Sequence, residues 1–230
     1  MRITFRGHAF FELETATGLR IVVDPFHQNP FTKVQPSQLR PDLLLLTHGH
    51  GDHLGCAVEI DAPTLAIYEM TNFLARRGVR KAIGMNLGGT YRTEGVAITM
   101  VPAQHSSGID PGAGGTFDGY GGSSAGFIID DGDQRFYHLG DTALFGDLRT
   151  VVRDVYGPTI AAVPIGDLYT MGPRYGAIAT AWCGVSHAIP IHYNTFPAIA
   201  QDPQDFVAAV AKEAPKTQVH VMEGDTSLEL

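Results

Sequence analysis

The pattern of apolar and polar positions predicts a chain of many short strands with helices among them. Near the N-terminus, short apolar or alternating runs are separated by Gly18 and Pro25, which is typical of an antiparallel meander. Residues 42–46 form a continuous apolar run, which predicts a fully buried strand. Further predicted strands lie at 64–68, 96–103, 125–131, 135–140, 159–166, 187–193, 218–223 and 226–230.

Helical spacing of apolar positions appears between these strands. Residues 69–79 carry Met70, Phe73 and Leu74 at helical spacing, and Asp202 followed by Pro203 is typical of a helix start. The predicted helices cover 69–79, 144–157, 173–185 and 202–214. With no linker and no repeat in the sequence, we expect one domain over residues 1–230, built from two sheets packed face to face with helices outside.

Composition narrows the classes of partner. The net charge is -8, which argues against a nucleic-acid partner because phosphate binding needs clustered Lys and Arg. No signal peptide is visible, and no apolar run is long enough to cross a bilayer, so no membrane partner is expected. Cys56 and Cys183 are the only cysteines and do not make a disulfide framework. We therefore expect a cytoplasmic protein with reduced thiols.

A cluster of coordinating side chains follows the leucine-rich strand at 42–46. His48, His50, Asp52 and His53 form the pattern H-x-H-x-D-H, with glycines that permit a tight backbone. A loop leaving a strand can point His48 and His50 toward one ion, while Asp52 and His53 turn toward a second. Clustered imidazoles on a glycine-rich loop have no packing rationale, so this pattern predicts metal binding.

Four ligands cannot close two metal shells, so further ligands are expected downstream. His105, Asp141 and His192 each lie at a predicted strand end or strand–loop junction, where a cluster can assemble in space. A carboxylate such as that of Asp141 can bridge two ions, which a neutral imidazole cannot do. Five imidazoles and two carboxylates suit two divalent ions, with zinc the best match and manganese or iron as alternatives.

Together these residues resemble the metallo-β-lactamase superfamily. More narrowly, the chain is similar to the small metal-dependent hydrolases of the L-ascorbate-6-phosphate lactonase type. The resemblance implies an α+β fold, an αββα four-layer sandwich of two mixed sheets with helices outside, and a dinuclear site at one edge. It rests on the stretches GHAFFELE, VVDPF, LLTHGHGDHLG, GMNLGG, VPAQHSSG, YHLGDTALF, PIGDLYTMGP and IPIHYNTFP.

The same resemblance implies how the ligands divide between the ions. His48, His50 and His105 would hold one ion. Asp52, His53 and His192 would hold the other, with Asp141 between the two. 

Four more residues are candidates for supporting roles. The resemblance makes Asp24 an acceptor that orients a ligand histidine, where the sequence alone permits a simple turn residue. His8 matches a position near the metal edge, and a purely structural histidine is the alternative. Ser106 and Asn194 flank two predicted ligands, so they either bind substrate or cap their loops.

Some conspicuous residues receive a structural interpretation. His138 lies in a buried strand, and Cys56 is expected to be a small buried residue. The segment 108–122 is too rich in glycine for a regular element, and it is interpreted either as a mobile flap or as a contact in a homo-oligomer.

The predicted site suggests a hydrolase. Two ions that share a water can lower its pKa toward neutrality, so we expect a metal-bridging hydroxide to cleave an ester, lactone or phosphoester bond of a small molecule. Asp52 is the candidate catalytic residue, because it can orient the nucleophile and move a proton. One alternative is a di-iron redox protein on the same fold, although those relatives place a glutamate where this chain has His50. The other is a metal-binding protein without turnover.

Overall fold

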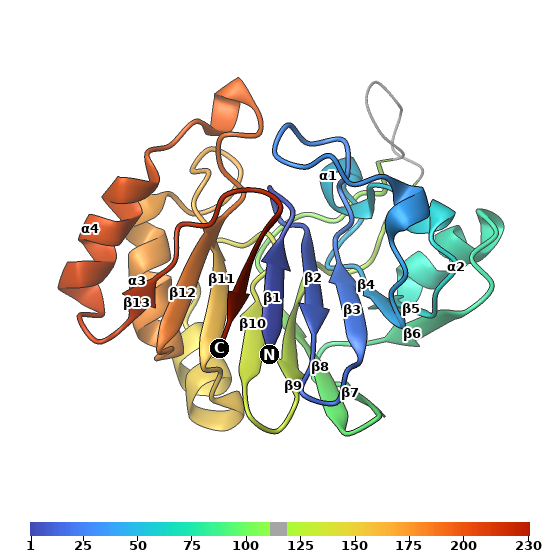
Figure 1. The fold of residues 1–230 in the computed structure, drawn as a ribbon, viewed down its shortest axis with the longest axis horizontal. Coiled ribbons are helices and arrows are strands. Elements are labelled where there is room, and N and C mark those ends of the chain that lie inside the picture. The colour runs from blue at the N-terminus through green and yellow to red at the C-terminus, as the bar shows by residue number, and fades with distance from the viewer. Residues whose placement is uncertain (111–118) are drawn as a thin grey trace.

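The computed structural model describes residues 1–110 and 119–230, and over these residues it contains two seven-stranded sheets packed face to face (Figure 1). The first sheet has the order β14-β1-β2-β3-β4-β5-β6. Strands β1 to β3 are antiparallel, and β3 to β6 run parallel, so the sheet is mixed. Its strands are β1 (Arg2–Phe5), β2 (Phe11–Glu14), β3 (Arg20–Val23), β4 (Leu43–Leu45), β5 (Thr64–Ile67), β6 (Ala82–Met85) and β14 (Thr226–Glu229).

The second sheet is mixed in the same way and has the order β13-β12-β11-β10-β9-β8-β7. The strands from β7 to β10 are antiparallel, whereas those from β10 to β13 are parallel. The chain thus completes one sheet before the other, and only β14 returns to pair with β1. The strands are β7 (Thr90–Thr93), β8 (Val96–Pro102), β9 (Ala125–Asp130), β10 (Arg135–His138), β11 (Ile160–Pro164), β12 (His187–Ile191) and β13 (Gln218–Val219).

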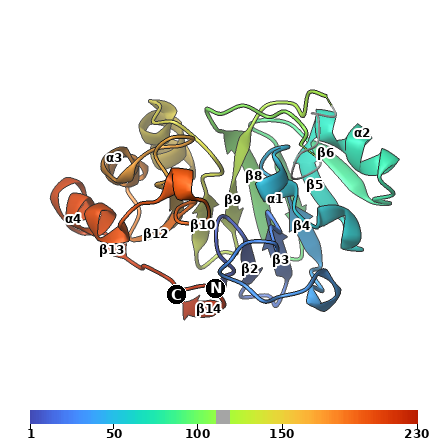
Figure 2. The ribbon, with the colours of Figure 1, turned by 90° about the horizontal axis from the view of Figure 1, so that it is seen from above.

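Helices cover the outer faces of both sheets, which confirms the predicted αββα sandwich (Figure 2). Helix α2 packs on β5 and β6 of the first sheet, and α3 packs on β11 of the second. Helix α4 begins as predicted, because the Asp202 side chain accepts a hydrogen bond from the Gln204 amide at 2.8 Å. The helices are α1 (Gly51–Leu54), α2 (Tyr68–Arg76), α3 (Pro173–Cys183), α4 (Pro203–Glu213), the π-helix η3 (Leu148–Tyr156) and the short turns η1 (Pro36–Gln38), η2 (Ala57–Glu59) and η4 (Pro197–Ile199).

Alternate residues of the second sheet belong to two different hydrophobic layers. Phe127 and Ile129 of β9 pack in the core between the sheets. Ile128, which lies between them, packs with residues of α3, α4 and η3 on the outer face. This is the period of two that a strand with both faces buried must satisfy. The sandwich therefore has its largest core between the sheets and a second one under the helices.

Two edge strands were not predicted. β6 contains Gly84 and is only partly buried, and β7 reads TYRT with no buried residue, so neither shows a strong apolar pattern. The helix predicted at 144–157 begins later and has wide π turns. In the glycine-rich segment, Gly108 and Tyr120 form an isolated bridge, and residues 111–118 lie outside the described residues. None of the helices described in the structure is both long and apolar enough to span a bilayer.

Candidate metal centre

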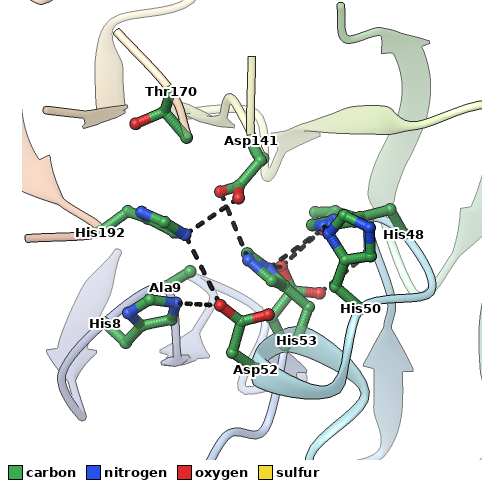
Figure 3. Close-up of polar contacts among 12 residues, drawn as sticks. His8, Ala9, His48, His50, Asp52, His53, Asp141, Thr170 and His192 are labelled. Carbon is green, nitrogen blue, oxygen red and sulfur yellow. Dashed lines mark hydrogen bonds and ion pairs between the residues drawn. The ribbon is translucent and has the colours of Figure 1, made fainter. Parts of the chain in front are cut away.

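The predicted metal ligands gather at one edge of the sandwich, where strands of both sheets end (Figure 3). His48 lies just beyond the C-terminal end of β4, Asp141 beyond β10 and His192 beyond β12. Since β10 and β12 are parallel to the strand between them, their C-terminal ends meet at one edge. Topology therefore brings together side chains that are more than 140 residues apart in the sequence.

The H-x-H-x-D-H motif is not a loop throughout. His48 and His50 lie on the segment after β4, whereas Asp52 and His53 lie in the first turn of α1, which differs from the expected loop. Close packing explains the glycine between the first two histidines. A Cβ on Gly49 would lie 3.0 Å from the carbonyl oxygen of Gly108, so a side chain there would push the neighbouring segment away.

Three histidines form the first group of candidate ligands. One ring nitrogen from each of His48, His50 and His105 lies within 4.8 Å of the others. His48 Nε2 lies 3.0 Å from His50 Nδ1. His48 is fully buried, and the other two are partly exposed, so this group lies at the protein surface. These are the three residues that the resemblance to the superfamily implied for one ion.

The second group contains Asp52, His53 and His192, and the structure adds His8 to it. His192 Nε2 lies 3.8 Å from Asp52 Oδ2, and His8 Nε2 lies 3.1 Å from the same oxygen. The Asp52 side chain is 25% exposed, whereas the three imidazoles are buried. Asp52 is thus the member of this group that a small molecule can reach.

Asp141 lies between the two groups. Its Oδ1 is 3.3 Å from His53 Nε2, and its Oδ2 is 2.9 Å from His192 Nε2 and 3.6 Å from His105 Nε2. Its carboxylate is almost completely buried and faces histidines of both groups. All seven side chains predicted as metal ligands therefore belong to three overlapping groups, and Asp141 contacts members of both sets of ligands. Figure 3 shows six of the seven around one point, with His48, His50, Asp52, His53, Asp141 and His192 labelled.

A hydrogen-bonded chain behind the site fixes two of the imidazoles. The Thr47 hydroxyl donates to Asp24 Oδ2 at 2.7 Å, so its oxygen is left to accept from His48 Nδ1 at 3.0 Å. His53 Nδ1 donates to the same Asp24 oxygen at 2.7 Å. With Nδ1 donating on both rings, Nε2 is the nitrogen of His48 and of His53 that faces the site, and in the neutral ring it offers the lone pair that a metal ligand requires.

Several polar atoms of the site lack a hydrogen-bond partner. Among the described residues, His53 Nε2, His192 Nε2 and Asp141 Oδ1 are buried and form no hydrogen bond of acceptable geometry, although the two nitrogens lie 3.3 and 2.9 Å from the Asp141 carboxylate. An unsatisfied buried polar group costs about 1–3 kcal/mol, so these poorly oriented atoms need a further partner. Lone pairs of two imidazoles and a carboxylate are the donors that divalent transition metals prefer. The residues therefore fit a metal ion.

Electrostatics within the cluster are strongly coupled. Burial holds the pKa of His48 well below its usual value and also lowers the pKa of His105. Burial opposes the charged form of His53 too, but the carboxylates of Asp141 and Asp24 outweigh it and raise the pKa of His53 well above its usual value. Without an ion, a proton on His53 therefore compensates the buried carboxylates.

The carboxylates of the site stay ionised. Burial alone would favour the neutral form of Asp141, but His192 and His53 hold its pKa well below the usual value. The same holds for Asp52, where burial is outweighed by the hydrogen bond from His8 and the charge of His53, and the pKa is lowered. Both carboxylates are therefore ready to bind a cation at neutral pH.

Two threonines support the site. Thr47 completes the chain from Asp24 to His48, and Thr195 Oγ1 lies 2.8 Å from His8 Nδ1. Sequence reasoning missed Thr47, whose position directly before His48 is the only signal that marks it. His8 itself, a candidate from the sequence, is held between Thr195 and Asp52, with its backbone at φ 58°.

The remaining candidates differ in their contacts. Ser106 is exposed, and its Oγ lies 3.5 Å from His50 Nε2, so it faces the site. Asn194 uses its side-chain oxygen to accept from the Gln201 amide at 2.8 Å, which ties it to its own loop. His138 donates from Nε2 to the Ala9 carbonyl at 2.8 Å and accepts from the Gly140 amide at 3.1 Å. Both ring nitrogens of His138 are therefore hydrogen-bonded to the backbone and are not available to a metal ion.

Comparison with known proteins identifies the family. The family described as "Beta-lactamase superfamily domain" matches residues 19–193. A UPF0173 metal-dependent hydrolase of Methanobrevibacter smithii is 42% identical over 96% of this chain and 94% of its own length. Another of Methanosarcina mazei is 43% identical over 100% of this chain and 99% of its own. The chain belongs to the UPF0173 family of the β-lactamase superfamily.

Solved structures agree with this assignment of the UPF0173 chain. Igni18, described as a novel metallo hydrolase from Ignicoccus hospitalis, superposes with a TM-score of 0.86 and 33% identity, and the alignment covers 100% of this chain and 98% of that one. The resemblance to the metallo-β-lactamase superfamily that the sequence motifs indicated is thereby confirmed.

Proposed function

We propose that this UPF0173 chain is a dinuclear metal-dependent hydrolase that cleaves an ester, lactone or phosphoester bond of a small molecule. One observation carries the proposal: the Asp141 carboxylate lies between two groups of histidines whose ring nitrogens converge on it. His48, His50 and His105 would hold one ion. Asp52, His53 and His192 would hold the other, and Asp141 would contact both.

Two divalent ions would supply an activated water and a Lewis acid for the oxygen of the scissile bond, with zinc the best match to the donor set and manganese or iron as alternatives. The protein contributes the rest. Asp24 and Thr47 hold the rings of His48 and His53 in one tautomer, and the buried walls keep the ligand rings in fixed positions. Little rearrangement is then needed when a substrate arrives.

Asp52 is the proposed proton carrier. Its carboxylate is ionised and partly exposed, and one of its oxygens is held by His8 at 3.1 Å. The carboxylate would accept a proton from the nucleophilic water and pass it to the leaving group. His8, fixed in turn by Thr195, would keep this carboxylate in one orientation.

The sequence left two alternative functions, a di-iron redox protein and a metal-binding protein without turnover. The residues of the candidate site argue against both. A redox site of the di-iron type would have a glutamate in place of His50. In this chain the position is a histidine, whose Nδ1 lies 3.0 Å from His48 Nε2, so an imidazole and not a carboxylate faces the site there. A purely structural metal would be expected in a closed shell of protein ligands. Here Asp52 and His105 are partly exposed, which leaves a side of the cluster open to small molecules.

Metal analysis together with an activity panel tests the proposal. Purified protein is expected to contain about two ions per chain, and zinc or manganese is expected to restore hydrolysis of at least one lactone, ester, thioester or phosphodiester after chelation. The function is wrong if the fully loaded protein hydrolyses none of these classes. Oxygen consumption with a reductant and iron would favour the redox alternative.

A further inference from the structure

A cavity of about 430 Å³ lies beside the candidate metal centre, on the side of His8. Its lining is mostly apolar and includes Phe5, Phe31, Tyr193, Val221 and Met222. His8 also lines it, and the same imidazole lies 3.1 Å from Asp52. The cavity is therefore one side chain away from the carboxylate that we propose as the proton carrier.

Aromatic rings extend this apolar surface around His8. Phe26 and Phe196 each contact the His8 ring edge-on, with centroids 5.5 and 5.8 Å away, and Phe196 is 39% exposed. Phe31 and Val221, on the cavity wall, are also 39% exposed. Large apolar side chains left in contact with water beside a site are typical of a surface that binds an apolar group.

The cavity wall formed by residues 221–224 is fixed in place. Asp225 accepts hydrogen bonds from Arg6, from the Thr32 hydroxyl and from the Lys33 amide. A Cβ on Gly224 would lie only 1.9 Å from the Phe31 carbonyl oxygen, so the two segments are in direct backbone contact. The cavity is therefore preformed, which reduces the entropy lost when a ligand binds.

The charge of the lining selects against anions. Among the described residues that line the cavity, Glu223 is the one with a full charge, and no lysine or arginine is present. Arg6, a cation close to this wall, is paired with Glu12 at 2.7 Å and with Asp225 at 2.9 Å, and Lys33, which is exposed next to it in the fold, is not among the residues that line the cavity. A phosphate or carboxylate group in the cavity would thus lose its water without gaining a cation.

The opposite side of the metal centre is different. A cavity beside His105 is lined by four serines, Ser106, Ser107, Ser123 and Ser124, together with Leu87, Pro102 and Tyr120. The Ser124 hydroxyl is already used, because it donates to the backbone carbonyls of His105 and Ser106. Figure 3 places His8 and His192 on one side of the Asp52 and Asp141 carboxylates, and His48 and His50 on the other. A substrate that spans the centre would therefore meet a mixed polar and apolar surface at one end and mostly apolar side chains at the other.

We infer that the substrate is an uncharged ester or lactone with an apolar acyl or aryl substituent, and that this substituent occupies the cavity between His8, Tyr193 and residues 221–224. The inference rests on the proposed function and narrows it. It favours carboxylic esters and lactones over phosphorylated substrates, because the lining of the cavity offers an apolar surface and no cation.

The first experiment compares p-nitrophenyl acetate, butyrate and octanoate with p-nitrophenyl hydrogen glutarate, which carries a terminal carboxylate. Burial of each methylene group is worth a factor of about four, so kcat/KM is expected to rise at least tenfold from acetate to octanoate. The glutarate ester is expected to be a poorer substrate than butyrate. Equal kcat/KM for all three neutral esters, or a preference for glutarate, would overturn the inference.

A substitution connects this preference to the cavity. Val221→Asp places a charge on the cavity wall, and it is expected to lower kcat/KM for octanoate at least tenfold while leaving acetate within about twofold. Val155→Asp is the matched control, because Val155 is 69% exposed on η3 and does not line the cavity. If both variants kept the octanoate preference, the cavity would not be the binding site.

A binding measurement separates the two proposals. Isothermal titration of the metal-free protein with octanamide is expected to give saturable binding that Val221→Asp weakens at least tenfold, whereas acetamide does not bind. Hydrolysis without octanamide binding and without chain-length dependence overturns the cavity assignment alone. Octanamide binding by a protein that hydrolyses no ester, lactone, thioester or phosphodiester with any metal overturns the proposed function and the substrate class with it. Hydrolysis of phosphodiesters alone overturns the substrate class and leaves the proposed function standing.

Discussion

His53 Nδ1 lies 2.7 Å from Asp24 Oδ2, and that oxygen also accepts the Thr47 hydroxyl proton at 2.7 Å. Asp24 is fully buried, so this carboxylate has no solvent to replace these donors. The Thr47 hydroxyl that donates to Asp24 also accepts from His48 Nδ1, so Asp24 helps to orient the ring of His48, which lies in the other group of candidate ligands. One buried carboxylate thus orients a histidine of each group.

Asp24→Asn tests this arrangement. The variant keeps the shape of the side chain, but Asp24 accepts with both oxygens: the Thr47 amide donates to Oδ1, and the Thr47 hydroxyl and His53 Nδ1 donate to Oδ2. The NH2 group of asparagine would therefore face a donor in either orientation of the amide. We expect the affinity for zinc to fall about 10–100-fold, as for other residues that orient metal ligands. Competition with a chromophoric chelator measures it. Asp131→Asn is the control, because Asp131 is a buried carboxylate that accepts backbone amides far from the site and should leave zinc affinity unchanged.

Asp141→Asn tests the carboxylate between the two groups. Its oxygens face His53, His192 and His105, so the amide would lose the charge shared by both groups. We expect fewer than two ions per chain by elemental analysis and a fall of at least about a hundredfold in kcat/KM on the best substrate. Asp133→Asn, at an exposed position in the β9–β10 turn, should change neither quantity. Full activity in Asp141→Asn would contradict the bridging role.

Much of the fold was predictable because the strands leave a strong pattern. β4 and β11 are continuous apolar runs, and Asp202 with Pro203 marks the start of α4 in the sequence itself. β6 and β7 were not predicted, because an edge strand with a glycine or with polar side chains has no pattern of its own. Their existence depends on the neighbouring strands with which they pair.

The candidate site was predictable in its residue types but not in its supporting contacts. The spacing of the first four ligands indicated metal chemistry, and strand ends suggested the other three. The role of Thr47 could not be predicted, because it depends on the ring orientations of His48 and His53. The contact of His8 with Asp52 likewise depends on a turn at φ 58° that brings distant segments together.

The two cysteines are expected to be unreactive in the folded protein. Cys56 and Cys183 are buried, and burial raises the pKa of each thiol to about 12. A raised thiol pKa means that the neutral form persists as the pH rises, so at pH 8 only about one thiol in ten thousand is ionised. Ellman's reagent should therefore react with neither in native protein at pH 8 and with both in guanidinium. Rapid labelling of a native thiol would contradict the burial.

His138→Leu is expected to separate stability from metal binding. The substitution removes the partner of the Ala9 carbonyl and of the Gly140 amide in a buried position, and unsatisfied groups of this kind cost about 1–3 kcal/mol each. The free energy of unfolding should fall by about 2–6 kcal/mol in urea titrations. Two ions per chain should still bind at a temperature where the variant is folded, because neither nitrogen of His138 faces the site.

His187→Leu is the matched control for this variant. Its ring is only partly buried and contacts His220, with 3.0 Å between Nδ1 and Nε2, at the end of β12 away from the site. A loss of free energy of unfolding well below that of His138→Leu is therefore expected. If His138→Leu instead kept full stability and lost an ion, His138 would have to be counted among the metal-site residues, and the assignment of its nitrogens to the backbone would be wrong.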